Sequence, residues 1–191
     1  MVAAFFLLSF TRAEEDPIDR LGIKGPIEFN KTNFKLSWTA KPNDNNYVQE
    51  YLPNAEQPDK FNHMLTVHLF LTENETKDVV QKKIEWLENR KTTDKLCNYV
   101  VNESPDGKEF MIDFLVGDSK GDKMTVAEFN IYRYSQVDLG NNKKGILIFF
   151  YSERSYGDEI PTFLNGLGQE RTKYLNEMIS TEMSPIKIVK D

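Results

Sequence analysis

Residues 109–153, "EFMIDFLVGDSKGDKMTVAEFNIYRYSQVDLGNNKKGILIFFYSE", decide the fold. Apolar, β-branched and aromatic residues predict strands over 109–117, 123–135 and 145–153. The links between them, "DSKGD" and "LGNNKKG", are rich in Gly, Asn and Asp, which tolerate the positive φ of hairpin turns. Short turns join antiparallel neighbours, so the stretch predicts a meander. "ILIFFY" is apolar on both faces and predicts a central strand covered on both sides.

The flanking segments extend this pattern in both directions. A fourth meander strand is predicted at 96–102, followed by the turn sequence "SPDG". Apolar residues at helical spacing predict helices before and after the meander, over 73–90 and about 159–180. Three strands are predicted before the first helix, at 34–40, 47–52 and 61–72. This order predicts an α+β fold, an antiparallel sheet with a C-terminal four-stranded meander and helices packed on the sheet in an α/β/α-type sandwich.

Local signals indicate where the helices begin. Thr72 and Glu75 have the spacing of a capping box, which predicts the start of the first helix. Pro161 fits the first turn of the second helix, where a missing N–H costs nothing. Gly166 and Gly168 are expected to weaken that helix by about 1 kcal/mol each relative to Ala.

The order of elements resembles that of the PsbP-like proteins, exported or lumenal domains first known beside photosystem II. The series from "FKLSW" through "TENETKDVVQKKIEWL" and "ILIFFY" to "EIPTFLNGL" carries the resemblance and covers most of the chain. No short motif is shared. Members of that family are mainly binding and assembly factors, so the resemblance implies the fold and leaves the partner open.

The amino terminus, "MVAAFFLLSFTRA", is typical of a secretory signal peptide, with a short apolar run before small residues at Thr11 and Ala13. The run is too short to span a bilayer, which takes roughly 20 residues. We expect a signal peptide at 1–13, no membrane span after its cleavage, and a single domain at 14–191 that opens with a loose lead-in at 14–24. No Lys or Arg precedes the apolar run, so either the true start lies upstream of Met1 or the signal is atypical. The alternative to a signal peptide is a buried first strand or helix.

Composition narrows the class of protein. The chain has 191 residues and an ordinary globular balance, with 28% charged and 39% hydrophobic residues. Its net charge is −6, which argues against nucleic acid as a partner, because phosphate binding needs clustered Lys and Arg. Cys97 is the single cysteine, so no intrachain disulfide is expected. Export without a disulfide suits a bacterial periplasm better than a eukaryotic secretory route, so we expect an extracytoplasmic protein, periplasmic or secreted.

The chain has two histidines, His63 and His68, both in the strand predicted at 61–72. Side chains of a strand alternate between its faces, so an odd separation predicts that the two rings point to opposite faces. We therefore expect no shared metal. The sequence also lacks the second cysteine or the HExxH pattern that would complete a zinc site, and it contains no cofactor fingerprint.

The sequence "GDSKG" at 117–121 matches the G-x-S-x-G nucleophile elbow, yet it predicts a hairpin turn. An elbow needs a helix after the serine, whereas a strand is predicted after Ser119. Both histidines precede the serine, so no base follows it in the order that hydrolases use. Cys97 is expected to be a packed thiol. No catalytic residue is predicted.

Two weaker candidates for partner or anion binding remain. Tyr47, Tyr51 and Phe61 surround a loop with two prolines, where they either form a partner-binding surface or pack the loop onto the sheet. Arg154 precedes the last helix, whose N-terminal amides could meet an anion there. The acidic residues at the start of that helix compete for the same position.

The sequence favours an exported, non-enzymatic binding or accessory domain for an unknown protein or small-molecule partner. One alternative is a small exported hydrolase that uses two carboxylates, which requires a concave pocket with the pair roughly 5 to 9.5 Å apart. Another is a carrier of an apolar small ligand, which requires an open cavity between sheet and helix.

Overall fold

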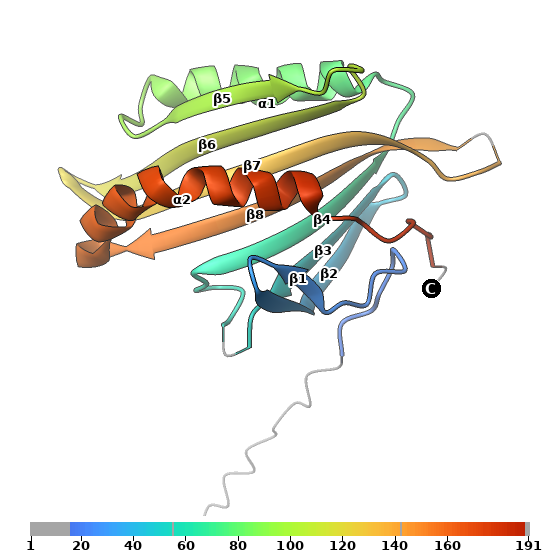
Figure 1. Ribbon diagram of the computed structural model, residues 1–191, viewed down its shortest axis with the longest axis horizontal. Helices are drawn as coiled ribbons and strands as arrows, with labels where there is room; N and C mark the ends of the chain where they lie inside the picture. The colour runs from blue at the N-terminus through green and yellow to red at the C-terminus, as the bar shows by residue number, and fades with distance from the viewer. Residues whose placement is uncertain (1–15, 55, 142, 190–191) are drawn as a thin grey trace, which may run out of the picture.

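A computed structural model describes residues 16–54, 56–141 and 143–189 (Figure 1). These residues form an α+β fold with one eight-stranded antiparallel sheet, in the order β1-β2-β3-β4-β8-β7-β6-β5. The strands are β1 Ile27–Phe29, β2 Thr32–Asn43, β3 Asn46–Leu52, β4 His63–Leu71, β5 Asn98–Glu103, β6 Glu109–Lys120, β7 Lys123–Asp138 and β8 Lys144–Tyr156. The helices are α1 Thr76–Lys91 and α2 Ile160–Ser180, with a 3-10 turn at Gly157–Glu159 before α2.

The predicted meander is confirmed. Strands β5 to β8 follow one another both along the chain and across the sheet. β8, which contains "ILIFFY", lies between β4 and β7 and is a central strand. Its pairing with β4 runs without a register shift from His63 opposite Glu153 to Leu71 opposite Gly145. β4 and β8 therefore form the middle pair of the sheet.

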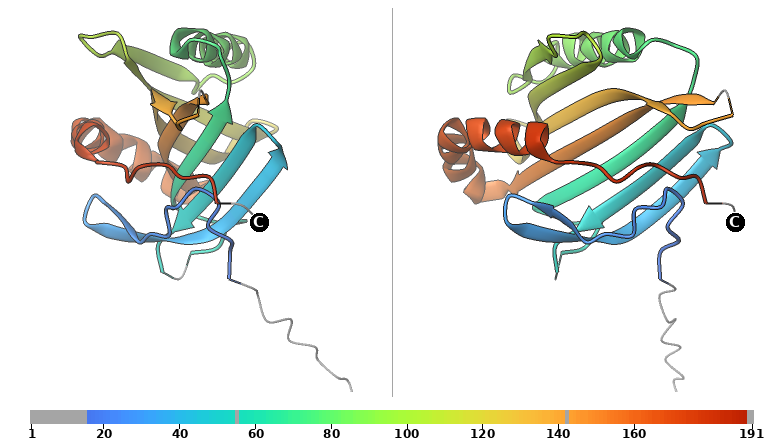
Figure 2. Two further views of the ribbon diagram at one scale, coloured as in Figure 1. Left: turned by 90° about the vertical axis from the view of Figure 1, so that its right-hand side faces the viewer. Right: turned by 45° about the vertical axis from the view of Figure 1, so that its right-hand side comes forward.

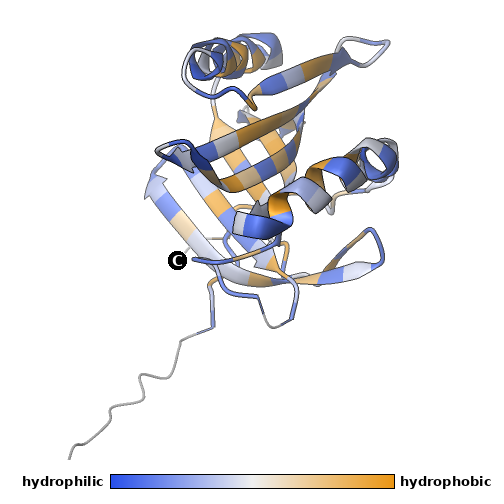
Figure 3. Ribbon diagram, turned by 90° about the vertical axis from the view of Figure 1, so that its left-hand side faces the viewer, coloured by the Kyte–Doolittle hydropathy of each residue, from blue (hydrophilic) through white to orange (hydrophobic). Residues whose placement is uncertain are grey.

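The two helices pack on opposite faces of the sheet (Figure 2). Alternate residues of β8 show this division, since Phe149 belongs to the core under α2 while Ile148 belongs to the core under α1. Apolar residues gather on the central strands between the helices (Figure 3). Neither helix of the described chain is long and apolar enough to cross a membrane.

The prediction of a loose lead-in at 14–24 is wrong for the part that the structure describes. Leu21 and Ile23 are 0% and 6% exposed and belong to the core under α2. The fully buried Gln49 of β3 holds them, because its Oε1 accepts from the amide of Leu21 at 3.0 Å and its Nε2 donates to the carbonyl of Ile23 at 3.3 Å. The short edge strand β1, which the sequence analysis missed, follows directly. The predicted signal peptide at 1–13 lies outside the described residues.

The capping box at the start of the first helix is also a wrong prediction. The Oγ1 of Thr72 accepts a hydrogen bond from the amide of Asn74 at 3.1 Å, so it caps a turn before the helix. α1 begins at Thr76, and Glu75 precedes it without a side-chain cap. The expectation for Pro161 is confirmed, since it lies in the first turn of α2.

Candidate functional site

The largest of the described cavities is a groove of about 1070 Å³ where several strand ends meet. We call it the strand-end groove. Its walls come from the β2–β3 turn, the exit of β4, the β7–β8 hairpin and the C-terminal tail, which gather at the right-hand end of Figure 1. It is lined by Lys41, Asp44, Asn45, Tyr47, Phe70, Leu71, Thr72, Glu73, Leu139, Gly140, Asn141, Lys143, Lys144, Ile186, Lys187 and Ile188.

Backbone hydrogen bonds hold the walls of the groove in place. The amide of Leu71 donates to the carbonyl of Asn45 at 2.8 Å, which ties the exit of β4 to the β2–β3 turn. The tail is tied to the lead-in, because the amide of Lys187 donates to the carbonyl of Leu21 at 3.0 Å.

The groove is lined by an excess of positive charge in an otherwise acidic chain. Lys41 lies beside Asp44, with Nζ to Oδ1 at 2.9 Å. The other three lysines of the lining, Lys143, Lys144 and Lys187, are exposed and make no ion pair with any described residue. Apolar side chains such as Ile186 lie between them. Three unpaired ammonium groups beside apolar surface suit a ligand with an anionic group and an apolar part.

The structure places the predicted aromatic residues in the interior. Tyr47, Tyr51 and Phe61 are 7%, 0% and 5% exposed, so their rings do not form an exposed partner surface. The three rings are packed in the interior, which is the second of the two alternatives that the sequence left open. The hydroxyl of Tyr51 donates to the carbonyl of Ile23 at 2.6 Å, and burial raises the pKa of Tyr51. Tyr47 is the one that also contributes to the strand-end groove.

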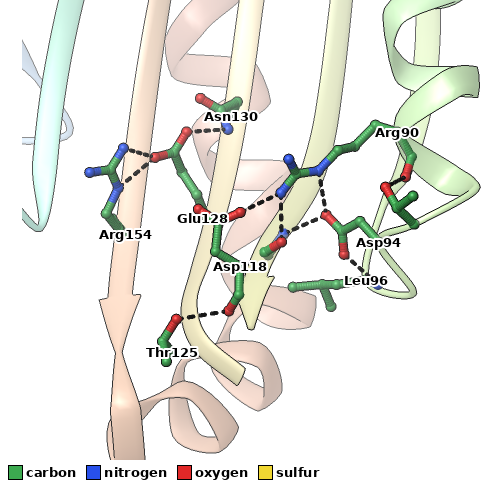
Figure 4. A network of polar contacts seen from close by, with 10 residues as sticks. Arg90, Asp94, Leu96, Asp118, Thr125, Glu128, Asn130 and Arg154 are labelled. Carbon is green, nitrogen blue, oxygen red and sulfur yellow. Dashed lines mark hydrogen bonds and ion pairs between the residues drawn. The ribbon is translucent and has the colours of Figure 1, made fainter. Parts of the chain in front are cut away.

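Arg154 is engaged within the sheet rather than at a helix terminus (Figure 4). Its Nε donates to Oε2 of Glu128 at 2.6 Å, and its guanidinium lies 4.2 Å from the ring centroid of Phe61. Oε1 of Glu128 also accepts from the side-chain Nδ2 of Asn130 at 2.9 Å. The predicted anion site at this residue is therefore filled by the chain's own carboxylate.

A second polar network joins the end of α1 to β6 (Figure 4). Arg90 donates to Asp94 at 3.1 Å, to Asp118 at 2.6 Å and to the carbonyl of Gly117 at 2.7 Å. The carboxylate of Asp94 also accepts from the amides of Gly117 and Leu96 at 2.7 and 2.9 Å. Each of these charged groups has hydrogen-bond partners within the network, so we infer that the network has a structural role.

His63 and His68 lie on opposite faces of the sheet, as predicted. The unbroken pairing of β4 with β8 preserves strand alternation between them. His63 Nδ1 lies 3.0 Å from Glu56 Oε1, and its Nε2 lies 4.0 Å from Glu153 Oε1. Burial lowers the pKa of His68, whose Nε2 lies 3.2 Å from Asn46 Oδ1. The described part of the chain contains no group of three or more His, Cys, Asp or Glu side chains arranged to hold a metal ion.

Ser119 lies in a hairpin and Cys97 lies in the core, as the sequence analysis predicts for each. Ser119 is exposed near the tip of the β6–β7 hairpin, opposite Met124, and a strand rather than a helix follows it. Cys97 is buried under α1, and burial raises the pKa of its thiol. Neither has the setting of an activated nucleophile.

Lys83 of α1 has a setting that the sequence analysis did not single out. Its Nζ lies 4.0 Å from the ring centroid of Trp86, 4.4 Å from that of Phe114 and 4.7 Å from that of Tyr132. It makes no ion pair or hydrogen bond with any other residue that the structure describes. Burial lowers the pKa of Lys83 to about 8, and the charge of Glu128 opposes this shift.

Two other cavities bear on the two alternative functions, a hydrolase that uses two carboxylates and a carrier of an apolar ligand. One of about 650 Å³ is lined by four carboxylates, of which Glu109 pairs with Arg133 at 3.0 Å and Asp106 with Lys108 at 3.6 Å. A mostly apolar cavity between the β5–β6 turn and the end of α2, near Ile179, holds about 240 Å³. That is below the 300 to 1,000 Å³ of ordinary small-molecule pockets.

Fold and groove together define an α+β domain with a lysine-bordered cavity at one end of its sheet. A protein-family model matches residues 21–183, and the chain belongs to that family. The match runs from the buried Leu21 to the tail after α2, so it includes the whole sheet and both helices. The family description states no activity. No curated protein and no solved structure matches the chain.

Proposed function

We propose that this protein is an exported, non-enzymatic binding or accessory domain, and that the strand-end groove takes an anionic ligand with an apolar part. The observation that carries the proposal is the trio Lys143, Lys144 and Lys187, which are exposed at one cavity and form no ion pair with any described residue. With Lys41 they outnumber the two carboxylates of the lining, Asp44 and Glu73. Like charges repel one another, and a bound anion relieves that repulsion while apolar wall residues cover its hydrocarbon part.

The proposal includes a PsbP-like architecture and an extracytoplasmic location, periplasmic or secreted. The order of strands and helices is compatible with a PsbP-like architecture. The apolar run that precedes Thr11 and Ala13 supports an extracytoplasmic location. An accessory domain of that kind binds a partner and catalyses nothing. A ligand such as an acylated or phosphorylated small molecule, or an acidic group on a protein, has the required chemistry.

Isothermal titration calorimetry with octyl phosphate, kept below its micelle concentration, tests this function. The triple variant Lys143→Glu, Lys144→Glu and Lys187→Glu is expected to bind at least about tenfold more weakly, since each lost contact to a charged group is worth roughly 1 kcal/mol or more. The matched control changes three exposed lysines outside the groove, Lys82→Glu, Lys95→Glu and Lys173→Glu. It carries the same change in net charge.

The proposal predicts that the control binds within about twofold of the wild-type protein and that added salt weakens binding. Octyltrimethylammonium, which has the same tail and the opposite charge, should not bind. No binding of octyl phosphate to the wild-type protein, or equal losses in the two triple variants, would contradict the proposal.

The carboxylate-dependent hydrolase remains a second proposal with a narrower basis. Glu56 and Glu153 flank the ring of His63, and burial raises the pKa of Glu153. None of the five described cavities is lined by His63, however. Turnover of an aryl glycoside that is lost in Glu153→Gln would favour it over the binding domain.

A further inference from the structure

We propose that β5 is a self-association edge, where the β5 strands of two copies of this chain pair and join their sheets into one antiparallel sheet. β5 forms the upper edge of the sheet in Figure 1. The juxtaposition that points to this partner is an outward row of backbone hydrogen-bonding groups centred on Val101. Glu103 lies at one end of the row, and Tyr99 lies at the other, beside Lys91. The inference goes beyond the strand-end groove, because no residue of β5 lines that groove.

Every second residue of β5 turns its backbone groups away from β6. The amide of Ser104, just after β5, donates to the carbonyl of Glu109 at 2.9 Å, and the pairing of β5 with β6 has no register shift. Because bonded and non-bonded pairs alternate along an antiparallel ladder, the even-numbered residues of β5 bond to β6. The residues whose amide and carbonyl groups point outward are therefore Tyr99, Val101 and Glu103. The amide of Tyr99 donates to Oδ1 of its neighbour Asn98 at 3.0 Å, as expected of an amide that faces away from β6.

β5 lacks the features by which edge strands usually avoid pairing, namely lysines, prolines and bulges. Its sequence, "NYVVNE", carries a charge only at its last residue, and its ladder with β6 is regular. Val100 and Val101, on its two faces, are 45% and 37% exposed. The other edge of the sheet, β1, has three residues, and the amide of Asn30 after it donates to Glu177 of α2 at 3.1 Å. β5 is therefore the edge of the sheet that is open to a further strand.

The outward row of β5 is complementary to itself. A two-fold axis perpendicular to the sheet at Val101 places Val101 of the two copies opposite each other and Tyr99 opposite the second copy's Glu103, so all outward residues pair. Glu103 makes no ion pair with any described residue of its own chain. In the pair it comes beside Lys91, whose Nζ lies 4.2 Å from the ring centroid of Tyr99 and 2.9 Å from Glu88. An ammonium group has three donors, so Lys91 can serve both carboxylates.

Apolar groups meet on the α2 face of the same pair. Val100 lies on this face, because it pairs with Asp113, the residue that Arg171 of α2 binds. The register places Val100 opposite the second copy's Asn102, which lines the apolar cavity of about 240 Å³ beside Ile179. Val100 and Ile179 are 45% and 60% exposed in the single chain. A second copy therefore supplies both the backbone groups that the edge needs and an apolar side chain for the cavity next to it.

Single introduced cysteines test both the association and its register. In Val101→Cys the two new thiols stand directly opposite each other, with Cα atoms about 5.5 Å apart, which a disulfide can span. Val100→Cys is the matched control, because it is the adjacent exposed residue but its two copies lie two residues out of register, more than about 7 Å apart. Under mild oxidation, non-reducing electrophoresis should show a cross-linked dimer forming at least about tenfold faster for Val101→Cys. The wild-type protein, whose Cys97 is buried, is the blank.

Sedimentation equilibrium measures the association without a cross-link. The dimer of the wild-type protein should accumulate between about 1 μM and about 500 μM, the range expected of a small interface. Val101→Pro removes an outward amide and no bond to β6, and Val101→Lys sets two ammonium groups opposite each other, so each should weaken the dimer at least about tenfold. Val101→Thr keeps the outward amide and should stay within about threefold of the wild-type protein.

Circular dichroism confirms that each variant is folded. A wild-type protein that stays monomeric at every concentration would overturn the proposal. Cross-linking of Val100→Cys as fast as that of Val101→Cys would also overturn it, because the two strands would then not pair about Val101.

Discussion

The guanidinium of Arg171 in α2 holds the carboxylate of Asp113 in β6 through two parallel hydrogen bonds. Nε donates to Oδ2 at 2.7 Å and Nη2 donates to Oδ1 at 2.8 Å. Asp113 is only 3% exposed, and the contact joins residues 58 positions apart in the chain. This ion pair therefore fixes α2 against the meander in a way that apolar packing alone does not specify.

Replacing Arg171 by Met should destabilise the protein by about 3 kcal/mol, because the change leaves the carboxylate of Asp113 buried and unpaired. The double variant Arg171→Met with Asp113→Leu should recover most of that loss, since both charges are gone. Urea unfolding gives the three free energies. Lys108→Met, which breaks a pair with both side chains exposed, is the control and should change stability by less than about 0.5 kcal/mol. A loss for Arg171→Met as small as the control's would contradict this assignment.

Alanine at two glycines should shift stability in opposite directions. A Cβ at Gly166 of α2 meets nothing within 4 Å, so Gly166→Ala should stabilise the protein by about 1 kcal/mol through helix propensity. A Cβ at Gly117 would lie 3.1 Å from Leu96 Cδ2 and 3.2 Å from the carbonyl oxygen of Val126, so Gly117→Ala should destabilise it. Thermal unfolding measures both, and a change of the same sign at the two sites would refute the packing described here.

Glu153 should make stability depend on pH. Burial raises its pKa above the ordinary value, and the charge of His63 only partly opposes this. A carboxyl whose folded-state pKa is raised contributes stability below its unfolded pKa and loses that contribution as pH rises through the folded value. Glu153→Gln should therefore gain stability relative to the wild-type protein between about pH 4 and pH 7. Denaturant unfolding across this range measures the difference, and a constant difference would show that Glu153 titrates as in the unfolded chain.

Zinc should not bind to His63 and His68 together, because the sheet separates their rings. In calorimetric titrations, His63→Gln and His68→Gln should each leave the response to Zn²⁺ within error of that of the wild-type protein. One tight Zn²⁺ per chain that either substitution removes equally would require a bulge in β4, contrary to the continuous register with β8.

The meander could be predicted because its information is local. Gly121 and Gly140, both with positive φ, mark its turns, and the strands between them show their own periodicity. The burial of Leu21 could not be predicted in the same way, since it depends on hydrogen bonds to Gln49, 28 residues away. The neighbours of Leu21 in the sequence are polar, so the local pattern does not indicate that this segment is buried against the sheet.

The candidate sites depend even more on tertiary structure. The strand-end groove unites residues from Lys41 to Ile188, which no short window of sequence can contain. The helical period of α1 predicted the helix from its apolar residues, but that period carries no information about the setting of Lys83. Only the position of Phe114 and Tyr132 beneath the helix shows that the stem of Lys83 turns inward.

Mapping of octyl phosphate by ¹H–¹⁵N NMR tests the central claim, that the strand-end groove binds an anionic ligand, most directly. We predict saturable shifts at the backbone amides of Lys143, Lys144 and Lys187 and of the β4 exit near Leu71, with little change on α1. The same shifts should be absent with octyltrimethylammonium. Shifts that centre on the cavity around Glu109 and Arg133, or shifts that do not saturate at any site, would contradict the claim.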